Sequence, residues 1–150
     1  MAANLTTYGP SGGVAFSTKK AANQDNLSTG GYAYVTWGTE RYDIGGNVSG
    51  NSFTAPVTGK YLLTASVQVN QIQTNATYLD LRLYTSNRLY QTFISDPTVI
   101  GTYDSMRNTF LVDMDASDVA NVALYIEAGT AGTDLASGDN AGFFAGCLVA

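Results

Sequence analysis

Histidine is absent from the 150 residues of this chain, and cysteine occurs only once. The absence of histidine excludes Ser-His-Asp triads, Cys-His dyads and imidazole metal sites. The single thiol, Cys147, allows no disulfide framework, and its place in an apolar closing segment predicts a small buried side chain. No glycine pair has the G-x-x-x-x-G-K spacing of a phosphate loop. The sequence therefore predicts a protein that is not an enzyme and that needs no cofactor.

Charge is also sparse, at 13% of the residues, and the net charge is −5. The seven basic residues are scattered, with Lys19-Lys20 the only adjacent pair, so we expect neither nucleic acid nor anionic lipid as the main partner. No apolar run approaches the roughly 20 residues of a membrane-spanning helix, so no membrane insertion is expected. The first residues show neither a charged n-region nor an apolar h-region, which predicts synthesis in a cytoplasm.

What the sequence does contain is a series of short, alternating strands. In Asn51–Val69, every second residue from Tyr61 onward is apolar, while Pro56 and Gly59 mark a turn before this strand. Similar segments recur along the chain, and no 3.6-residue period is long enough for a helix. Further strands are expected at Val14–Ser17, Tyr32–Trp37, Tyr78–Tyr84, Leu89–Ile94, Met106–Met114, Val119–Glu127 and Ala141–Val149. Roughly eight to ten short strands predict a two-sheet, antiparallel, all-β jelly-roll sandwich.

Alternation also predicts which side chains face the core. Asp80 and Arg82 fall on the outward face of their strand, between leucines that point inward. The inward residues of these strands include Trp37, Leu79, Leu81, Leu83, Met106, Phe110, Val112, Met114, Val122, Leu124 and Ile126.

The closing strand is informative about assembly. Phe143 and Phe144 are adjacent, so they point to opposite faces, and one of them is free to contact another molecule. Ten tyrosines and six phenylalanines exceed what one small core readily absorbs, although the extra tyrosines can also be scattered over the surface. We expect eight aromatic residues in the core or at a subunit contact: Phe16, Trp37, Phe53, Tyr61, Phe110, Tyr125, Phe143 and Phe144.

Four motifs occur in an order that is similar to a known family. The segment Phe53–Tyr61 reads F-T-A-P-V-x-G-x-Y, Val14–Ser17 matches an opening strand, Tyr42-Asp43 precedes the central motif, and Phe144–Leu148 matches a closing F-x-G strand. Together they resemble the globular head of the first complement component, subcomponent q, which shares its jelly roll with tumour necrosis factor. The resemblance spans Val14–Val149, nearly the whole chain.

The match has departures: Asn51 stands where the family has glycine, and Ser117-Asp118-Val119 replaces a Gly-Asp-x-Val. These departures indicate a distant member, of phage or bacterial origin. The resemblance implies a threefold homotrimer whose closing strand lies near the axis. Family members often carry a collagen-like stalk, and this chain has no Gly-x-y run.

From these features we expect a structural or binding protein on a virion surface, such as a phage fibre head, a capsid decoration or a receptor-binding knob. The segment Met1–Gly13 is expected to be a flexible arm, either a frayed terminus or an anchor on capsid or tail proteins. A host-surface glycan or protein is the expected outer ligand. The alternative is a secreted or cell-surface recognition head. The loops expected to face outward are Lys19–Gly31, Asp96–Asp104 and Gly129–Asn140.

Two acidic clusters remain. Asp113, Asp115 and Asp118 form a D-x-D-x-x-D pattern that resembles the start of a calcium loop, but the required glycine is missing and the twelfth position is Leu124. Calcium binding and a solvated turn therefore both stay open. The acidic residues that flank Arg41, Glu40 and Asp43, are expected to form a surface salt-bridge cluster with it.

Overall fold

The computed structural model describes residues 13–95, 103–127 and 132–150. Nearly all of the expected arm, Met1–Gly13, lies outside the described residues, as do parts of two of the expected outward loops. Within the described ranges the chain contains strands and turns but no helix, so no helix there could cross a membrane.

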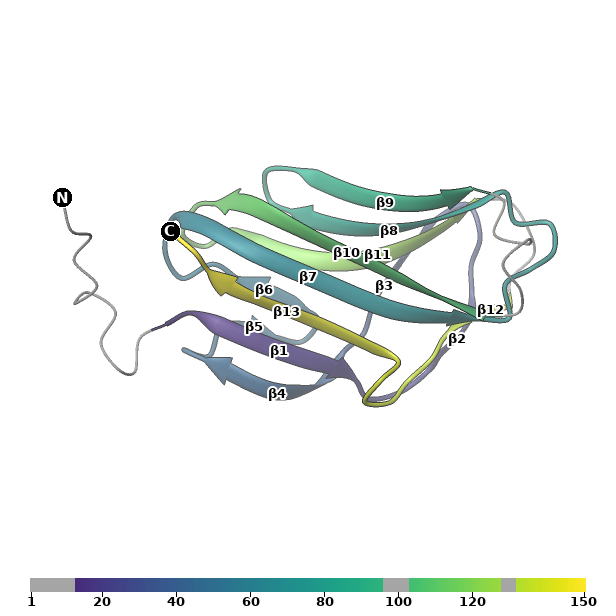
Figure 1. Cartoon of the computed structure of the whole chain (residues 1–150), viewed down its shortest axis with the longest axis horizontal. Helices are drawn as coiled ribbons and strands as arrows, with labels where there is room; N and C mark the ends of the chain where they lie inside the picture. Colours follow the sequence, from purple (N-terminus) through teal and green to yellow (C-terminus); the bar gives the residue numbers. More distant parts are fainter. Residues whose placement is uncertain (1–12, 96–102, 128–131) are drawn as a thin grey trace.

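The strands form two antiparallel sheets that stack as a sandwich (Figure 1). Sheet A contains β4 (Gly38–Ile44), β1 (Ala15–Lys20), β13 (Gly142–Leu148), β7 (Gly59–Asn70), β10 (Tyr103–Met114), β12 (Thr133–Leu135) and β2 (Gln24–Leu27). Sheet B contains β5 (Val48–Ser49), β6 (Ser52–Thr54), β11 (Val119–Glu127), β8 (Tyr78–Thr85), β9 (Leu89–Ser95) and β3 (Tyr32–Tyr34). The predicted two-sheet antiparallel jelly roll is confirmed.

Thirteen strands are present in the described residues, more than the sequence predicted. Two of the additional strands, β2 and β12, lie in segments that were expected to be loops, and they pair with each other. Their sequences are polar and show no alternation, so tertiary pairing decides their conformation. The backbone N–H of Asn26 in β2 donates to Asp134 Oδ1 in β12 at 2.7 Å, which holds the two short strands together.

The core lies between the sheets and is built on β7. Every odd residue of this strand from Tyr61 to Val69 is fully buried, as the alternation predicted. Leu62, an apolar residue at one of the even positions, points to the outward face of sheet A and is 41% exposed. Removing each of the buried aliphatic side chains from water contributes roughly 1.5–3 kcal/mol.

Aromatic rings fill the centre of this core. Phe16 stacks on Phe53 with ring centroids 4.5 Å apart and meets the edge of Phe144 at 4.9 Å. Trp37 packs on Phe144, and Phe53 meets Tyr61 at 5.5 Å. Phe144 is therefore the member of the Phe143-Phe144 pair that enters the core, which confirms that the two rings face opposite ways.

The structure shows what the residues of the F-T-A-P-V-x-G-x-Y motif do. The Tyr61 hydroxyl donates to the carbonyl of Val57 at 2.6 Å, so the buried ring ties down the turn that precedes its own strand. Ala55 exchanges two backbone hydrogen bonds with the β10–β11 turn, one with Ser117 and one with Asp118, each at 2.8 Å. The motif fixes a corner where the two sheets meet.

The glycine of the closing F-x-G motif is required by close packing. A Cβ atom on Gly146 would collide with Leu63 Cδ2, would lie 2.8 Å from Phe16 Cε1 and would lie 3.0 Å from the carbonyl of Leu62. Its absence allows β13 to lie against the aromatic core.

One side of the sandwich is open. The edge strands β9 of sheet B and β10 of sheet A both lie there, and their rings Tyr90 and Phe110 meet at 5.2 Å. Thr92 pairs with inward-facing Leu81, so it points between the sheets, yet it is exposed. The described residues therefore leave this edge, named here the β9–β10 edge, incompletely covered.

Candidate functional site

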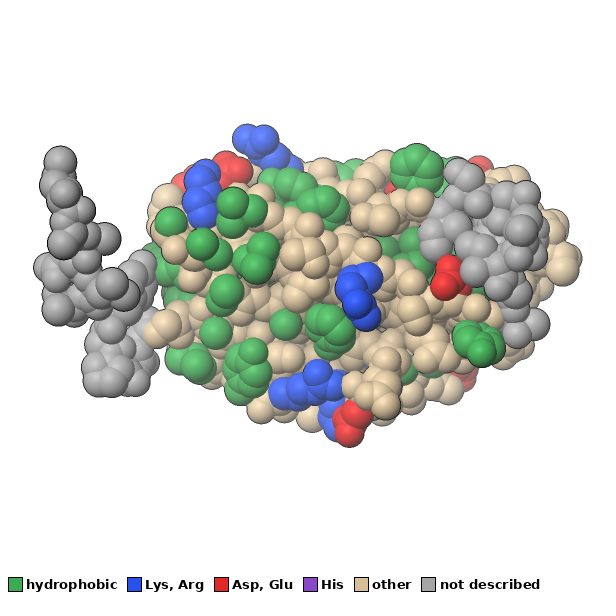
Figure 2. All heavy atoms as spheres, in the orientation of Figure 1, with side chains coloured by type: hydrophobic (Ala, Val, Ile, Leu, Met, Phe, Trp, Pro, Cys, Tyr) green, Lys and Arg blue, Asp and Glu red, His purple; other side chains and the backbone are tan. Residues whose placement is uncertain are grey.

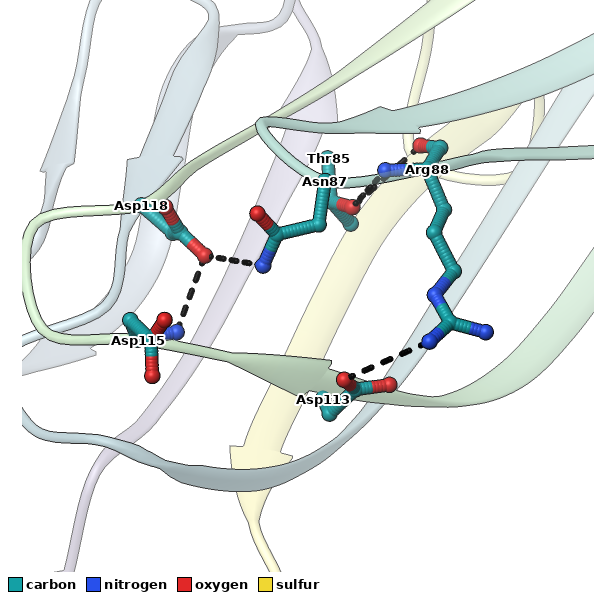
Figure 3. A network of polar contacts seen from close by, with 6 residues as sticks. All are labelled: Thr85, Asn87, Arg88, Asp113, Asp115 and Asp118. Carbon is teal, nitrogen blue, oxygen red and sulfur yellow. Dashed lines mark hydrogen bonds and ion pairs between the residues drawn. The ribbon is translucent and has the colours of Figure 1, made fainter.

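The three aspartates lie at the end of β10 and in the turn that leads to β11 (Figure 3). Asp118 Oδ2 accepts hydrogen bonds from the backbone N–H of Asp115 at 2.9 Å and from Asn87 Nδ2 at 2.7 Å. Asp113 faces Arg88 instead, with 3.8 Å between Oδ2 and Nη2. In the described parts of the chain, no three cysteine or carboxylate side chains lie close enough together to hold a metal ion. The hydrogen bonds to Asp118 organise the turn, and the three carboxylates are not gathered into one group.

The salt-bridge cluster expected at Glu40, Arg41 and Asp43 does not form among the described residues. Arg41 Nη2 donates to the backbone carbonyl of Asp139 at 2.6 Å, and Asp43 Oδ2 accepts from the backbone N–H of Val48 at 2.8 Å. The cause is a β-bulge in the pairing of β1 with β4, which leaves Arg41 unpaired and changes the direction of successive side chains.

Of the eight aromatic residues singled out from the sequence, five lie in the core. The other three are only partly buried: Phe110 packs against the core at the β9–β10 edge, Phe143 lies on the outward face of sheet A, and Tyr125 lies on the outward face of sheet B. The eight residues therefore occupy three different environments.

The outward face of sheet A carries a cluster of exposed apolar side chains toward one end. Strand register aligns Ile44, Ala15, Cys147, Leu62 and Leu111 in one row across five strands. The exposed members of the cluster, named here the apolar patch, are Tyr42, Ile44, Leu62, Leu111 and Val149, which are 41–60% exposed. Figure 2 shows hydrophobic side chains gathered toward the end of this face where the C-terminus lies.

The prediction that Cys147 is buried is wrong. Its side chain is only partly buried, because its register places it beside Leu62 on the outward face, opposite to the face of Phe144. It is a free thiol within the apolar row.

The outward face of sheet B has a different character. Asp80 and Arg82 lie on it as predicted, but they are not exposed: Asp80 is 1% exposed and Arg82 9%. Arg82 Nε donates to Asp80 Oδ2, and the guanidinium lies 4.6 Å from the ring centre of Tyr32 and 4.7 Å from that of Tyr125. The tyrosines cover the ion pair, which strand alternation alone does not reveal.

Electrostatics reinforce this arrangement. Burial lowers the pKa of the Arg82 guanidinium, but hydrogen bonds to Tyr84 and Asp80 and the charge of Asp80 outweigh that effect, and the net pKa is raised. A hydrogen bond to Glu127 raises the pKa of Tyr125 to about 12. Burial raises the pKa of Tyr84. Arg82 therefore stays charged, and Tyr84 and Tyr125 stay neutral, across the physiological pH range.

Lys20, at the end of β1, is fully buried on the core side of sheet A. Its ammonium donates to Gln24 Oε1 at 2.7 Å and to the carbonyl and hydroxyl oxygens of Thr36 at 3.2 and 3.4 Å. Burial lowers the pKa of Lys20 to about 8, partly offset by the charge of Asp25.

No family model matches the chain, and no curated protein sequence matches it significantly. Solved structures do match. The two-sheet antiparallel jelly roll is shared with the crystal structure of murine APRIL at pH 8.5, with a TM-score of 0.67 and 13% identity over 91% of this chain and 99% of that chain. The globular domain of zebrafish complement 1qA protein gives a TM-score of 0.65 and 14% identity over 92% of this chain and 98% of that chain. The chain therefore has the complement-q and tumour-necrosis-factor-like jelly-roll fold that its motifs indicated.

Proposed function

We propose that this chain is a non-enzymatic binding head that assembles as a homotrimer. The observation that carries the proposal is the presence of two different uncovered surfaces, the apolar patch on sheet A and the β9–β10 edge. Exposed apolar surface that gathers at one place on a small protein is typical of an interaction site.

The apolar patch is suited to close contact with another protein surface. Its neighbours along the face are small, such as Ala145 and Ser17, so the face offers little steric obstruction. The hydroxyls of Thr64 and Thr109 bond to each other at 2.8 Å, which satisfies part of their hydrogen-bonding capacity within the face.

The β9–β10 edge supplies the complementary surface. Tyr90 and Phe110 are partly buried against the core, and exposed Thr92 lies beside them between the sheets. Because neither edge strand has a pairing partner on its outer side among the described residues, covering this edge also removes a site of uncontrolled strand pairing.

A contact between two different surfaces is head-to-tail, and such contacts close into a ring when the rotation permits. In this proposal the β9–β10 edge of one protomer packs on the apolar patch of the next. The resemblance noted in the sequence supports three protomers per ring.

The test is the solution mass, measured by light scattering after size exclusion. The expected mass is three times the 15.8 kDa chain. Leu62→Lys in the patch and Thr92→Lys at the edge should each reduce it, because each places a charge at the proposed contact. Tyr34→Lys, which adds the same charge to the opposite sheet, is the matched control and should leave the mass unchanged. A wild-type mass equal to one chain would refute the assembly.

The proposal also includes a location for this binding head, the surface of a virus particle. A virion surface is supported by the recurrence of jelly rolls in capsid proteins and by the threefold positions that capsids and fibres offer to trimers. Residues that precede β1 would then attach the head to capsid or tail proteins. The test is co-purification with virus particles on a density gradient, and deletion of residues 1–12 should abolish it while leaving the number of chains per assembly unchanged.

The fold shared with the zebrafish complement 1qA domain favours a second setting, a secreted or cell-surface recognition head. Recovery of the chain from culture supernatant, free of particles, would support that setting against the virion surface.

A further inference from the structure

Five tyrosines lie together on the outward face of sheet B. They come from three neighbouring strands, and their rings form one continuous series of contacts. In order, Tyr34 meets Tyr84 at 6.1 Å, Tyr84 meets Tyr32 at 5.8 Å, Tyr32 meets Tyr125 at 5.1 Å, and Tyr125 meets Tyr78 at 5.8 Å. We name this surface the tyrosine platform.

The platform is held in place from beneath. The Arg82 guanidinium lies over the rings of both Tyr32 and Tyr125, and its ion pair with Asp80 fixes the arginine. Packing a cation against two ring faces stabilises both rings in one orientation. Rigid aromatic side chains with few torsions lose little entropy on binding, which makes them effective contact residues.

A cavity of about 260 Å³ opens at one end of the platform. It is lined by Thr77, Tyr78, Asp80, Arg82, Gln91 and Phe93. This volume is somewhat smaller than the pockets that hold drug-sized molecules, so it suits a single small ring. The platform extends beyond it and offers further aromatic surface.

One lining residue has an unused acceptor. Asp80 is 1% exposed, and its Oδ1 atom accepts no hydrogen bond from the described residues. A buried acceptor that lacks a donor is unfavourable, so a donor from a ligand or a water molecule would be stabilised there.

The charges of the face select against ionic ligands. Arg82 is already paired with Asp80, and it occupies the position between two rings that a ligand cation would take. In the described part of this face the remaining charge is Glu127, which accepts a hydrogen bond from the Tyr125 hydroxyl. An anionic ligand would therefore meet no unpaired cation.

We propose that the tyrosine platform and its cavity bind a neutral oligosaccharide. A sugar ring presents a C–H face that packs on tyrosine rings, and hydroxyl groups that both donate and accept hydrogen bonds. One ring would enter the cavity and donate to Asp80, and Gln91 would exchange hydrogen bonds with it. The following rings would lie along the platform. The proposal rests on the binding role proposed above, and it names the ligand class of that role.

The two proposals use different surfaces. The assembly uses the apolar patch on sheet A and the β9–β10 edge, whereas the platform lies on the outward face of sheet B, with Gln91 and Phe93 of its cavity on β9. The platform and its cavity are built from residues of one protomer. Consequently, the saccharide site does not require the trimer, and each proposal can fail alone.

The experiment uses the full-length protein on a printed array of neutral and sialylated oligosaccharides. Titration calorimetry follows with the neutral oligosaccharide that gives the strongest signal. We expect binding to neutral saccharides, weakened about tenfold or more by Tyr78→Ala, the size of a single aromatic hot spot. Gln91→Ala, which changes an exposed side chain at the cavity, should weaken binding without affecting folding.

The matched control is Tyr103→Ala, which removes a tyrosine that is 66% exposed and lies on β10 of sheet A, outside the platform and its cavity. It should bind as the wild type does. Circular dichroism and solution mass are recorded for every variant, so that loss of folding is recognised.

The outcomes separate the two proposals. Absence of neutral saccharide binding by a folded wild-type trimer would overturn the saccharide site and leave the assembly intact. Preference for sialylated saccharides, or capture of a protein that Tyr78→Ala abolishes while the array stays silent, would also overturn it. A monomer that binds neutral saccharides through Tyr78 would support the site and refute the trimer.

Discussion

Replacing Lys20 by methionine should remove a local electrostatic cost and, with it, a pH dependence of the free energy of unfolding. Lys20 is fully buried, and its ammonium has three acceptor oxygens, two of which belong to Thr36. Hydrogen bonds satisfy its protons, but they do not replace the full solvation that water gives to a charge. Burial therefore lowers the pKa of Lys20 from 10.5 to about 8.

The difference between the pKa of Lys20 in the folded and unfolded protein sets the size and the direction of the change in unfolding free energy with pH. Between pH 8 and 10.5 the folded protein holds fewer protons at Lys20 than the unfolded chain, so its free energy of unfolding rises with pH in that window. Below pH 8 both states are protonated and the contribution is constant. Across the window from pH 8 to 10.5 the free energy of unfolding rises by about 3 kcal/mol. Water that reaches the ammonium group reduces this value.

The assay is urea unfolding of wild type and Lys20→Met at one fixed protein concentration, from pH 7 to pH 11. The fixed concentration matters because association contributes to apparent stability. Other titrating groups cancel in the difference between the two proteins, which should grow in favour of wild type as the pH rises. Lys60→Met, which removes an exposed lysine, provides the control slope. A difference that stays constant from pH 7 to 11 would show that the amine reaches water in the folded state.

Three further substitutions test the local packing. Gly146→Ala should lower the free energy of unfolding by about 1–3 kcal/mol, since its Cβ meets core atoms, whereas Gly31→Ala, which has open space around it, should not. Tyr61→Phe removes the hydrogen bond to Val57 and should cost about 1 kcal/mol in the same urea assay. Asp118→Ala removes two hydrogen bonds from a turn and should lower the melting temperature, while a chelator should change neither melting nor mass. A chelator-induced drop in either quantity would contradict the role assigned to that turn.

The sandwich was predictable from the sequence because its strands bury one face and expose the other. The odd residues of β7 and the leucines of β8 are buried as alternation requires, and the order of four short motifs indicated the jelly roll. The strands that sequence analysis missed, such as β2 and β12, form through pairing with distant segments, and neither has a periodic signal of its own.

The surfaces were less predictable, because residue type alone does not say what covers a side chain. Cys147 was expected in the core, but its strand register places it on the outward face. Asp80 and Arg82 were assigned to the correct face, but tyrosines from other strands bury them. Strand alternation predicts that the outward-facing side chains include four tyrosines, Tyr32, Tyr34, Tyr78 and Tyr84. Alternation does not predict which strands pair, and that pairing is what brings these tyrosines together as the platform.

The two faces of this sandwich differ in a way that assigns them different partners. The apolar patch on sheet A presents aliphatic side chains beside small residues, a surface that gains stability chiefly by excluding water against a matching protein surface. Sheet B presents aromatic rings that carry hydroxyl groups, over a buried ion pair that keeps the rings in place. Such a surface can exchange a ligand reversibly, because it is polar enough to remain hydrated when empty. Permanent association is therefore expected through sheet A and reversible recognition through sheet B.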